Sequence, residues 1–287
     1  MVVLVLGILG VIVWSVDRRG DDDSAPEIVV DEPGVEHVHG LGMNPADGSL
    51  YVATHTGTFR IPDNGLAQRI GDSFQDTMGF TVVGADTFLG SGHPDVAGVR
   101  AGQPGLLGLI ESEDAGTTWT NLSLSGEVDF HALAYAHRRV YGWDSTSGRF
   151  MVSEDRVDWD ERSTLDLLGF AVDPDDPDHL VAATQSGTST SIDGGRTWSE
   201  PTTPAITTVA WSPGGDLWGI ELDGTVHRSA DGGARWTAIG KLPGEPQVLL
   251  ANDDALWAAA HGTSQRTGIY RSDDGGATWQ LRYEDPA

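Results

Sequence analysis

The sequence predicts an all-β fold: a six-bladed β-propeller of four-stranded antiparallel blades, preceded by an N-terminal transmembrane helix. Two observations predict the propeller. A turn peptide recurs about every 40 residues, which is the length of one four-stranded blade. Glycine is abundant, at 38 of 287 residues, as expected for many short strands joined by tight turns. An uncharged apolar run at the start of the chain predicts the helix.

Residues 1–16, MVVLVLGILGVIVWSV, carry no charge and would span about 24 Å as a helix, slightly less than the roughly 30 Å of a hydrocarbon core. We expect 1–16 to be a membrane anchor or signal segment, 17–27 a polar tether and 28–287 the propeller, held on the extracellular or cell-envelope side. Against this, Arg18 and Arg19 follow the run, the wrong side for an N-terminus inside the cell. A buried pair of strands is the alternative.

The charge and the cysteine content exclude several classes of function. The chain has 43 acidic and 17 basic residues, a net charge of −26. Because no basic surface is available to neutralise phosphates, nucleic-acid binding is excluded as a function. The absence of cysteine rules out disulfides and thiolate-bound zinc. We therefore expect a monomeric propeller with a soluble, self-repelling surface, or with a surface that attracts cations.

The recurring peptide is an octapeptide with four clear copies and two degenerate ones. The clear copies are SEDAGTTW (112–119), SIDGGRTW (191–198), SADGGARW (229–236) and SDDGGATW (272–279), and the degenerate ones are IPDNGLAQ (61–68) and SEDRVDW (153–159). Their aspartates are Asp63, Asp114, Asp155, Asp193, Asp231 and Asp274, spaced by 51, 41, 38, 38 and 43 residues. This spacing predicts six blades.

The octapeptide resembles the Asp-box, or BNR repeat, of sialidases and many other bacterial propellers. The resemblance implies a hairpin between the third and fourth strands of each blade, on the face opposite the usual binding side. In such a turn the aspartate accepts bonds from backbone N–H groups and the glycine takes a positive φ. The tryptophans are expected to pack into the blade interior; they are Trp119, Trp198, Trp236 and Trp279.

Two apolar strands precede each third strand, which gives blade spans of about 35–75, 76–127, 128–165, 166–204, 205–245 and 246–287. The segment EIVVD near residue 28 is a candidate extra strand that would close the ring. Across residues 27–287 the chain resembles exported bacterial proteins described as sialidase-like or glycosyl-hydrolase-like. That resemblance implies hydrolysis of glycans.

Histidines cluster where the first strand of a blade starts and the second strand ends. Both positions belong to the face opposite the repeated turns. Imidazole and carboxylate are suitable ligands for zinc, copper, nickel or iron. The candidate ligands of a divalent transition metal are His37, His39, His55, His93, His131, His261 and Asp144. Hydrogen bonding between blades is the structural alternative.

Carboxylates on the same face are candidates for catalysis of the glycosidase type, which uses two acidic side chains. The candidates are Asp76, Asp129, Asp166 and Glu221. The peptide FRIP, residues 59–62, is similar to a sialidase motif whose arginine binds the substrate carboxylate. Its alignment with other third strands predicts that Arg60 points away from that face, so no sialidase arginine triad is recognisable.

Three functions therefore stay open. The first is a membrane-anchored binding or scaffold propeller that holds a transition metal. The second is a sialidase-like glycoside hydrolase. The third is an assembly factor that docks a protein through a blade face. A glycan or protein partner is expected at the histidine face.

Overall fold

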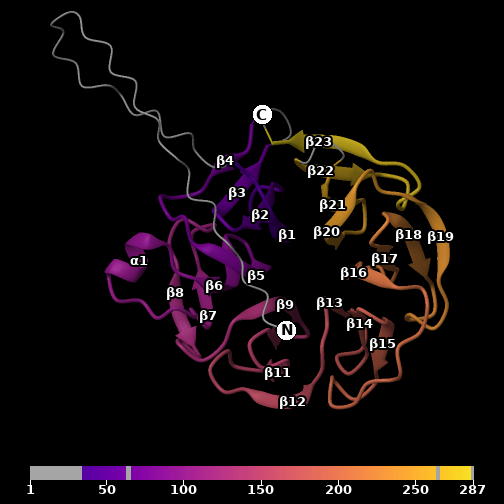
Figure 1. Cartoon of the computed structure of the whole chain (residues 1–287), viewed down its shortest axis with the longest axis horizontal. Helices are drawn as coiled ribbons and strands as arrows, with labels where there is room; N and C mark the ends of the chain where they lie inside the picture. Colours follow the sequence, from indigo (N-terminus) through magenta and orange to yellow (C-terminus); the bar gives the residue numbers. More distant parts are fainter. Residues whose placement is uncertain (1–33, 63–65, 263–265, 286–287) are drawn as a thin grey trace, which may run out of the picture. The chain divides into compact units, whose positions relative to one another are not determined.

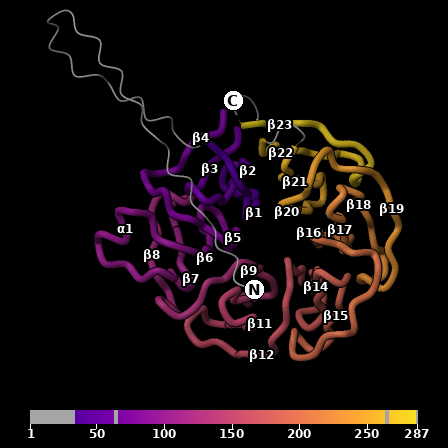
Figure 2. Tube along the Cα trace, in the orientation of Figure 1, coloured from indigo at the N-terminus to yellow at the C-terminus, as the bar shows by residue number. Residues whose placement is uncertain are grey.

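The computed structural model describes residues 34–62, 66–262 and 266–285, which form twenty-three β-strands and one short helix. The strands assemble into six antiparallel sheets, each built from one continuous stretch of chain. Figures 1 and 2 show the sheets following one another in chain order around a central axis, with the first strand of each sheet innermost. The predicted six-bladed propeller is confirmed.

The predicted anchor, the tether and the EIVVD segment lie outside the described residues. Within the described ranges, no helix is long and apolar enough to cross a membrane.

The first three blades have four strands each and match the predicted spans. Blade one consists of β1 (Val38–Met43), β2 (Leu50–Thr54), β3 (Gly57–Ile61) and β4 (Gln68–Arg69). Blade two consists of β5 (Asp76–Gly84), β6 (Thr87–His93), β7 (Leu109–Ser112) and β8 (Thr120–Ser123). Blade three consists of β9 (Phe130–Ala136), β10 (Arg139–Asp144), β11 (Arg149–Ser153) and β12 (Asp160–Thr164).

Blade four has three strands rather than four. It consists of β13 (Gly169–Val172), β14 (Leu180–Thr184) and β15 (Gly187–Ser191). Its outer edge is reduced to a single bridge between Thr188 and Thr202. Pro201 and Pro204 flank that bridge, and proline has no N–H to donate to a ladder, so a regular fourth strand does not form.

The last two blades again have four strands. Blade five consists of β16 (Ile206–Trp211), β17 (Leu217–Glu221), β18 (Thr225–Ser229) and β19 (Thr237–Lys241). Blade six consists of β20 (Glu245–Ala251), β21 (Leu256–His261), β22 (Thr267–Ser272) and β23 (Gln280–Glu284).

Blade two has a long connection between its second strand, which ends at His93, and its third strand, which begins at Leu109. Part of it forms the helix α1 (Val96–Arg100), whose N-cap Asp95 accepts a hydrogen bond from Gly98 N at 2.7 Å. None of the helix residues is buried. The insertion therefore sits on the outside of the ring, as Figure 1 shows.

The repeated turns have the structural role that the resemblance implies. Ser112 Oγ donates to Asp114 Oδ1 and accepts from Gly116 N, both at 2.8 Å. The Asp114 carboxylate also accepts the N–H and the hydroxyl of Thr118, at 2.8 and 2.7 Å. The serine and aspartate make the same pattern of backbone contacts around Asp193, Asp231 and Asp274. Asp63 lies outside the described residues.

Six apolar clusters form the core, one at each junction between neighbouring blades, including the junction of blade six with blade one. Between blades three and four, for example, Tyr141 and Phe150 pack with Phe170 and Leu180. Successive side chains of a strand point to opposite faces of its sheet, so in a ring of sheets they fill the spaces between blades.

The turn tryptophans correct one expectation. Each packs on the cluster that joins its blade to the preceding blade, rather than inside its own blade; these residues are Trp119, Trp159, Trp198, Trp236 and Trp279. The degenerate turn of blade one has no tryptophan, and Ala67 packs at its junction with blade six instead.

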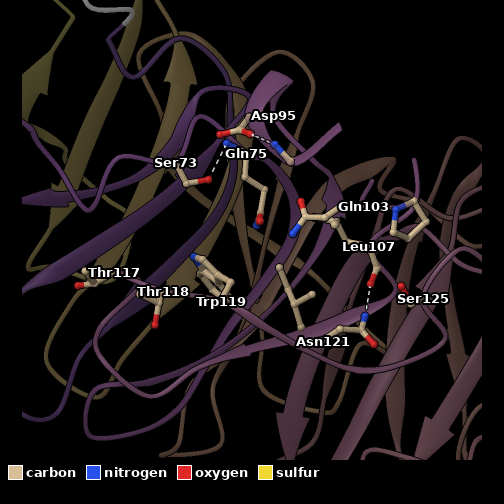
Figure 3. A pocket seen from close by; sticks show the side chains of 13 residues that line it. Ser73, Gln75, Asp95, Gln103, Leu107, Thr117, Thr118, Trp119, Asn121 and Ser125 are labelled. Atoms are coloured by element: carbon tan, nitrogen blue, oxygen red, sulfur yellow. Dashed lines mark hydrogen bonds between the residues drawn. The ribbon is translucent and has the colours of Figure 1, made fainter. Parts of the chain in front are cut away.

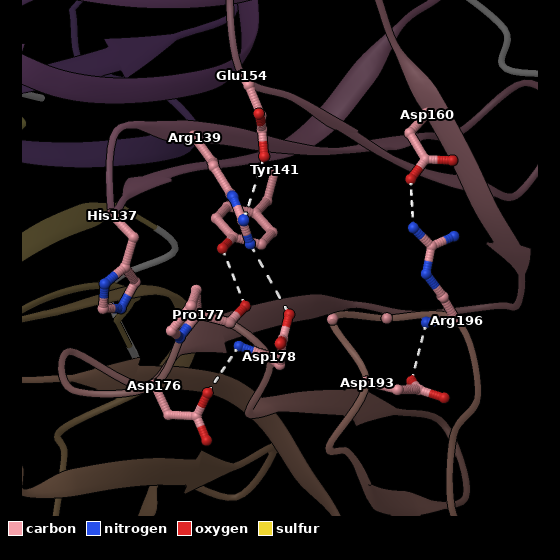
Figure 4. Close-up of polar contacts among 12 residues, drawn as sticks. His137, Arg139, Tyr141, Glu154, Asp160, Asp176, Pro177, Asp178, Asp193 and Arg196 are labelled. Carbon is pink, nitrogen blue, oxygen red and sulfur yellow. Dashed lines mark hydrogen bonds and ion pairs between the residues drawn. The ribbon is translucent and has the colours of Figure 1, made fainter.

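Polar contacts add to the apolar ones between blades three and four (Figure 4). Tyr141 donates its hydroxyl to Pro177 O at 3.0 Å. Arg139 lies 3.8 Å from Asp178, and Arg196 lies 2.6 Å from Asp160. Each of these pairs joins one blade to the next.

The ring is closed by contacts between blades one and six. Asp285 Oδ1 accepts Val35 N and the hydroxyl of Tyr283, both at 2.7 Å. Gln247 Oε1 accepts Val38 N at 3.1 Å. In the described part of the chain, no blade borrows a strand from the other end. Side-chain hydrogen bonds and an apolar cluster therefore close the propeller.

Candidate functional site

The face opposite the repeated turns collects the histidines of blades one, two and three. His37 and His39 stand at the start of β1, and His55 follows the end of β2. Antiparallel pairing of Val38 with Thr54 places these two strand ends side by side. The repeated turn follows the end of β3, at the other end of the sheet. The predicted separation of the histidines from the turns therefore holds for this blade.

A β-bulge aims one side chain of the inner strand toward the centre. In β1 the register shifts between Val38 and Gly40, so His39 has no partner residue in β2. A bulge at the same place in β9 leaves His131 unpaired. Bulges re-aim side chains and are frequent beside functional sites. A channel of about 580 Å³ lies along the inner strands, and both His39 and His131 line it.

The first group of ligand-type side chains consists of His37, His39 and His55, whose donor atoms all lie within 4.8 Å of one another. Asp76, at the start of β5, contacts two of them. His55 Nδ1 lies 3.2 Å from His39 Nε2 and 2.9 Å from Asp76 Oδ1. His39 Nε2 lies 3.8 Å from the same oxygen of Asp76. We call these four residues the first histidine group.

The second histidine group consists of His93, Asp129 and His131, again within 4.8 Å of one another. Asp129 Oδ2 lies 2.7 Å from His131 Nε2 and 3.4 Å from His93 Nε2. Asp129 is only 3% exposed, and among the described residues its Oδ1 is buried without a hydrogen-bond partner. The orientation of the His93 ring is fixed by its other nitrogen, because His93 Nδ1 lies 2.8 Å from Gly105 O.

Burial and neighbouring histidines lower the pKa of two side chains of the first histidine group, His37 and His39. Burial, followed by the neighbouring His55 and His37, lowers the pKa of His39 to about 2. Burial also lowers the pKa of His37. The hydrogen bond with Asp76 instead raises the pKa of His55. His37 and His39 are therefore neutral imidazoles at pH 7, with nitrogen lone pairs available.

Two of the predicted metal ligands stand apart from both groups. Asp144 is fully buried, and its carboxylate accepts hydrogen bonds from Thr146, Ser147 and Asp129 N. It therefore supports the loop after β10 and the backbone of Asp129. His261 ends β21; its charge contributes to lowering the pKa of His37, but it joins neither group.

The four candidate catalytic acids do not behave as a set. Asp76 and Asp129 contact histidines in the two groups. Glu221 lies 2.6 Å from His227 Nε2, and Asp166 is exposed. Arg60 pairs with Asp47 at 3.2 Å and donates to Ser49 at 2.9 Å, both in the connection between β1 and β2. It therefore lies away from the histidine face, as predicted.

Gln247 is a residue of this face that sequence reasoning missed. Its Oε1 accepts Val38 N, and its Nε2 lies 3.1 Å from His37 Nδ1. Alignment of the repeats puts Pro246 at this position, but a bulge between Pro246 and Val248 moves Gln247 into it. A one-residue shift in the alignment of blade six would have found it.

Comparison with known proteins supports the architecture. A family model for the BNR/Asp-box repeat matches residues 270–281, which contain the whole of the fourth clear octapeptide, 272–279. The chain is therefore a six-bladed β-propeller that carries a BNR/Asp-box repeat at residues 270–281. No curated protein matches the chain in sequence.

Three solved structures are similar in fold. A GH74 xyloglucanase from Xanthomonas campestris is 17% identical, with a TM-score of 0.57, and the match covers 86% of this chain. This chain thus spans 45% of the xyloglucanase. A chain of a nidogen/laminin complex is 12% identical, with a TM-score of 0.62; the match covers 81% of this chain and 91% of that one. YCF48 bound to a D1 peptide is 14% identical, with a TM-score of 0.54; the match covers 87% of this chain and 82% of that one. At these identities the likeness concerns the fold.

Proposed function

We propose that this propeller binds transition-metal ions at the two histidine groups. The observation that carries the proposal is the spacing of the donor atoms. Zinc bonds to nitrogen and oxygen of about 2.0–2.2 Å place tetrahedral ligand atoms about 3.4 Å apart. The three atoms contributed by His39, His55 and Asp76 are separated by 3.2, 2.9 and 3.8 Å.

Hydrogen bonds alone account less well for the same atoms. His55 Nδ1 faces both a nitrogen of His39 and an oxygen of Asp76, and it carries at most one hydrogen. A cation satisfies all three atoms at once. In the second group, Asp129 Oδ1 is buried without a hydrogen-bond partner in the described ranges, which is unfavourable for a carboxylate unless a cation compensates it.

The donor set indicates the class of metal. Imidazole with carboxylate, and no sulfur, suits Zn²⁺, Cu²⁺, Ni²⁺ or Fe²⁺ better than Ca²⁺ or Mg²⁺, which prefer oxygen ligands. The contact between His93 Nδ1 and Gly105 O leaves Nε2 to face Asp129. Metal-bound histidines generally donate their other nitrogen to a carbonyl or carboxylate in this way. The net charge of −26 also favours cations.

Zn²⁺ and Cu²⁺ titrated into tag-free protein test the proposal, with elemental analysis and calorimetry as readouts. We expect His39→Ala to weaken the first group and His131→Ala the second, each by at least about 10–100-fold, the range measured even for residues that only support ligands. His137→Ala is the matched control, because His137 is exposed and contacts Asp173 O away from both groups. Unchanged binding in the His39→Ala/His131→Ala double variant would overturn the proposal.

Metal binding should also stabilise the fold. At a free Zn²⁺ concentration of about 100 times Kd, linkage gives about 2.7 kcal/mol, or a rise in Tm of about 5–11 °C for a domain of this size. No shift in wild-type protein under these conditions would count against binding to the folded state.

The hydrolase alternative rests on the similarity to a glycoside hydrolase fold. Metal binding is favoured because Asp76 and Asp129 contact histidines rather than each other. Turnover of aryl glycosides that is lost in both Asp129→Ala and Glu221→Ala would reverse this preference.

We further propose that the propeller is a monomer anchored by residues 1–16 and exposed outside the cytoplasm. Membrane fractionation followed by protease treatment of intact cells tests this. A propeller that is protected from external protease would contradict it.

A further inference from the structure

We propose that a separate pocket on blade two binds a neutral sugar, either free or at the end of a glycan chain. The pocket measures about 370 Å³ and shares no lining residue with the histidine groups. It lies between the inserted connection that carries α1, the outer strands of blade two and the segment before β5 (Figure 3). Its size is within the roughly 300–1,000 Å³ of small-molecule sites.

The floor of the pocket combines apolar side chains with a buried amide. Leu107 and Ile110 are 5% and 3% exposed, and Gln75 is 8% exposed. Gln75 Nε2 donates to Thr77 Oγ1 at 3.1 Å, which fixes the amide. Gln75 Oε1 has no hydrogen-bond partner among the described residues, and it is not sealed from solvent. A nearly buried acceptor that faces a pocket is ready to receive a ligand hydroxyl.

Trp119 supplies an aromatic wall (Figure 3). The indole nitrogens of Trp159 and Trp198 donate to Ser123 and Ser163 of the preceding blade, at 3.0 and 3.1 Å. Among the described residues Trp119 has no such partner, and neither have Trp236 and Trp279; the indole nitrogens of those two are buried, whereas that of Trp119 is not. Its ring therefore offers an apolar face and a free N–H to a ligand, a combination typical of aromatic side chains at binding sites.

The strand register explains why the indole N–H of Trp119 has no partner in blade one. In blade two, Ile110 of the third strand pairs with Asn121 of the fourth, and Ser123 follows two residues after Asn121. In blade three, Met151 pairs with Glu161, and Ser163 follows two residues after Glu161. In blade one the corresponding pair is Phe59 with Arg69, so the position falls on Gly71, which has no side chain.

The rim is polar and uncharged except for one carboxylate. Gln103 offers an amide and Ser125 a hydroxyl. The Asn121 amide donates to Leu107 O and the Thr118 hydroxyl donates to Asp114, so these two side chains present only oxygen acceptors. Asp95 is engaged by the N–H groups of Gly98 and Phe74. No lysine or arginine lines the pocket, so an anionic ligand has no counter-charge. Amides and hydroxyls around an indole face match the hydroxyls and the C–H face of a neutral sugar.

Calorimetry on metal-free, full-length protein tests the proposal with glucose, galactose, mannose and N-acetylglucosamine, each also at the end of an oligosaccharide. We expect at least one to bind below about 10 mM, and Trp119→Ala and Gln103→Ala each to weaken it about tenfold or more. Gln103 is exposed, so its variant keeps the test valid if Trp119→Ala fails to fold. Tighter binding of the oligosaccharide assigns a chain end, and equal binding assigns a free sugar.

The double variant His39→Ala/His131→Ala should bind the sugar as the wild type does, which separates this site from the proposed metal centre. Exposed Gln185→Ala is the matched control for Gln103→Ala, because Gln185 does not line the pocket. Absence of binding by every sugar, or affinity unchanged in both pocket variants, would overturn the proposal. A preference for glucuronic acid over glucose would overturn it as well.

Discussion

The closure of the ring by Asp285 gives a quantitative test of how the propeller holds together. Its carboxylate accepts Val35 N and the Tyr283 hydroxyl, both at 2.7 Å. Val35 is 0% exposed and Tyr283 is 7% exposed, so water cannot easily replace the lost acceptor in Asp285→Ala. A buried N–H left without a partner costs about 1–3 kcal/mol, and a lost hydroxyl hydrogen bond about 0.5–1.5 kcal/mol.

The two contributions together predict that Asp285→Ala lowers the free energy of unfolding by about 2–4 kcal/mol. For a domain of this size, that loss corresponds to a fall in Tm of about 4–16 °C. Urea unfolding followed by tryptophan fluorescence measures the first quantity, and calorimetry the second. Asp285→Asn keeps one acceptor oxygen, and because both bonds end on the single oxygen Oδ1, it should lose less than half as much.

Asp254→Ala is the matched control, because it removes the same charge from an exposed position in blade six. It should change the free energy of unfolding by less than about 0.5 kcal/mol. If Asp285→Ala and Asp254→Ala destabilise the protein equally, the contacts of Asp285 do not close the ring.

Three further predictions concern the blades themselves. Gly142→Ala places a methyl group 2.6 Å from the Phe130 ring and should lower the free energy of unfolding in urea by about 1–3 kcal/mol. Gly169→Ala is the control, because Gly169 has open space around it and its variant should be nearly neutral. Equal effects of the two variants would contradict this prediction. Ser191→Ala leaves Gly195 N without its acceptor and should cost about 1–3 kcal/mol; a loss below 0.5 kcal/mol would show that the turn does not depend on it. Hydrogen bonds from threonine hydroxyls lower the pKa of turn aspartates such as Asp274 to about 2. The stability that these carboxylates contribute is therefore complete above about pH 4 and falls as the pH drops toward 2. A urea midpoint that stays constant over that pH range would contradict this prediction.

The sequence predicts the blades well because the repeated turn depends on local chemistry. Ser112 and Asp114 bond to backbone groups within four residues, so their spacing in the sequence reports a turn directly. The number of blades follows from that spacing, and the face that carries the turns follows from the resemblance to the Asp-box. The missing outer strand of blade four is also local, since Pro201 and Pro204 are visible in the sequence.

The candidate site is less predictable because it depends on register and on partners far apart in the chain. Bulges decide that His39, His131 and Gln247 leave the ladder, and no residue pattern marks them. Its place at the end of a second strand also makes Asp144 a candidate ligand like the histidines. Only the structure shows that the Asp144 carboxylate accepts hydrogen bonds from the loop that follows it. Only the structure shows, too, that the other candidate ligands form two groups rather than one.

The way in which the blades follow the chain bears on how such a protein can be rearranged. Each described sheet is one unbroken segment, and the joint between the first and last blades is made by side chains. Opening the polypeptide between two other blades, and linking blade six to blade one, would leave every ladder whole. Circular permutants cut at blade boundaries should therefore fold, and single blades are natural units for exchange by recombination.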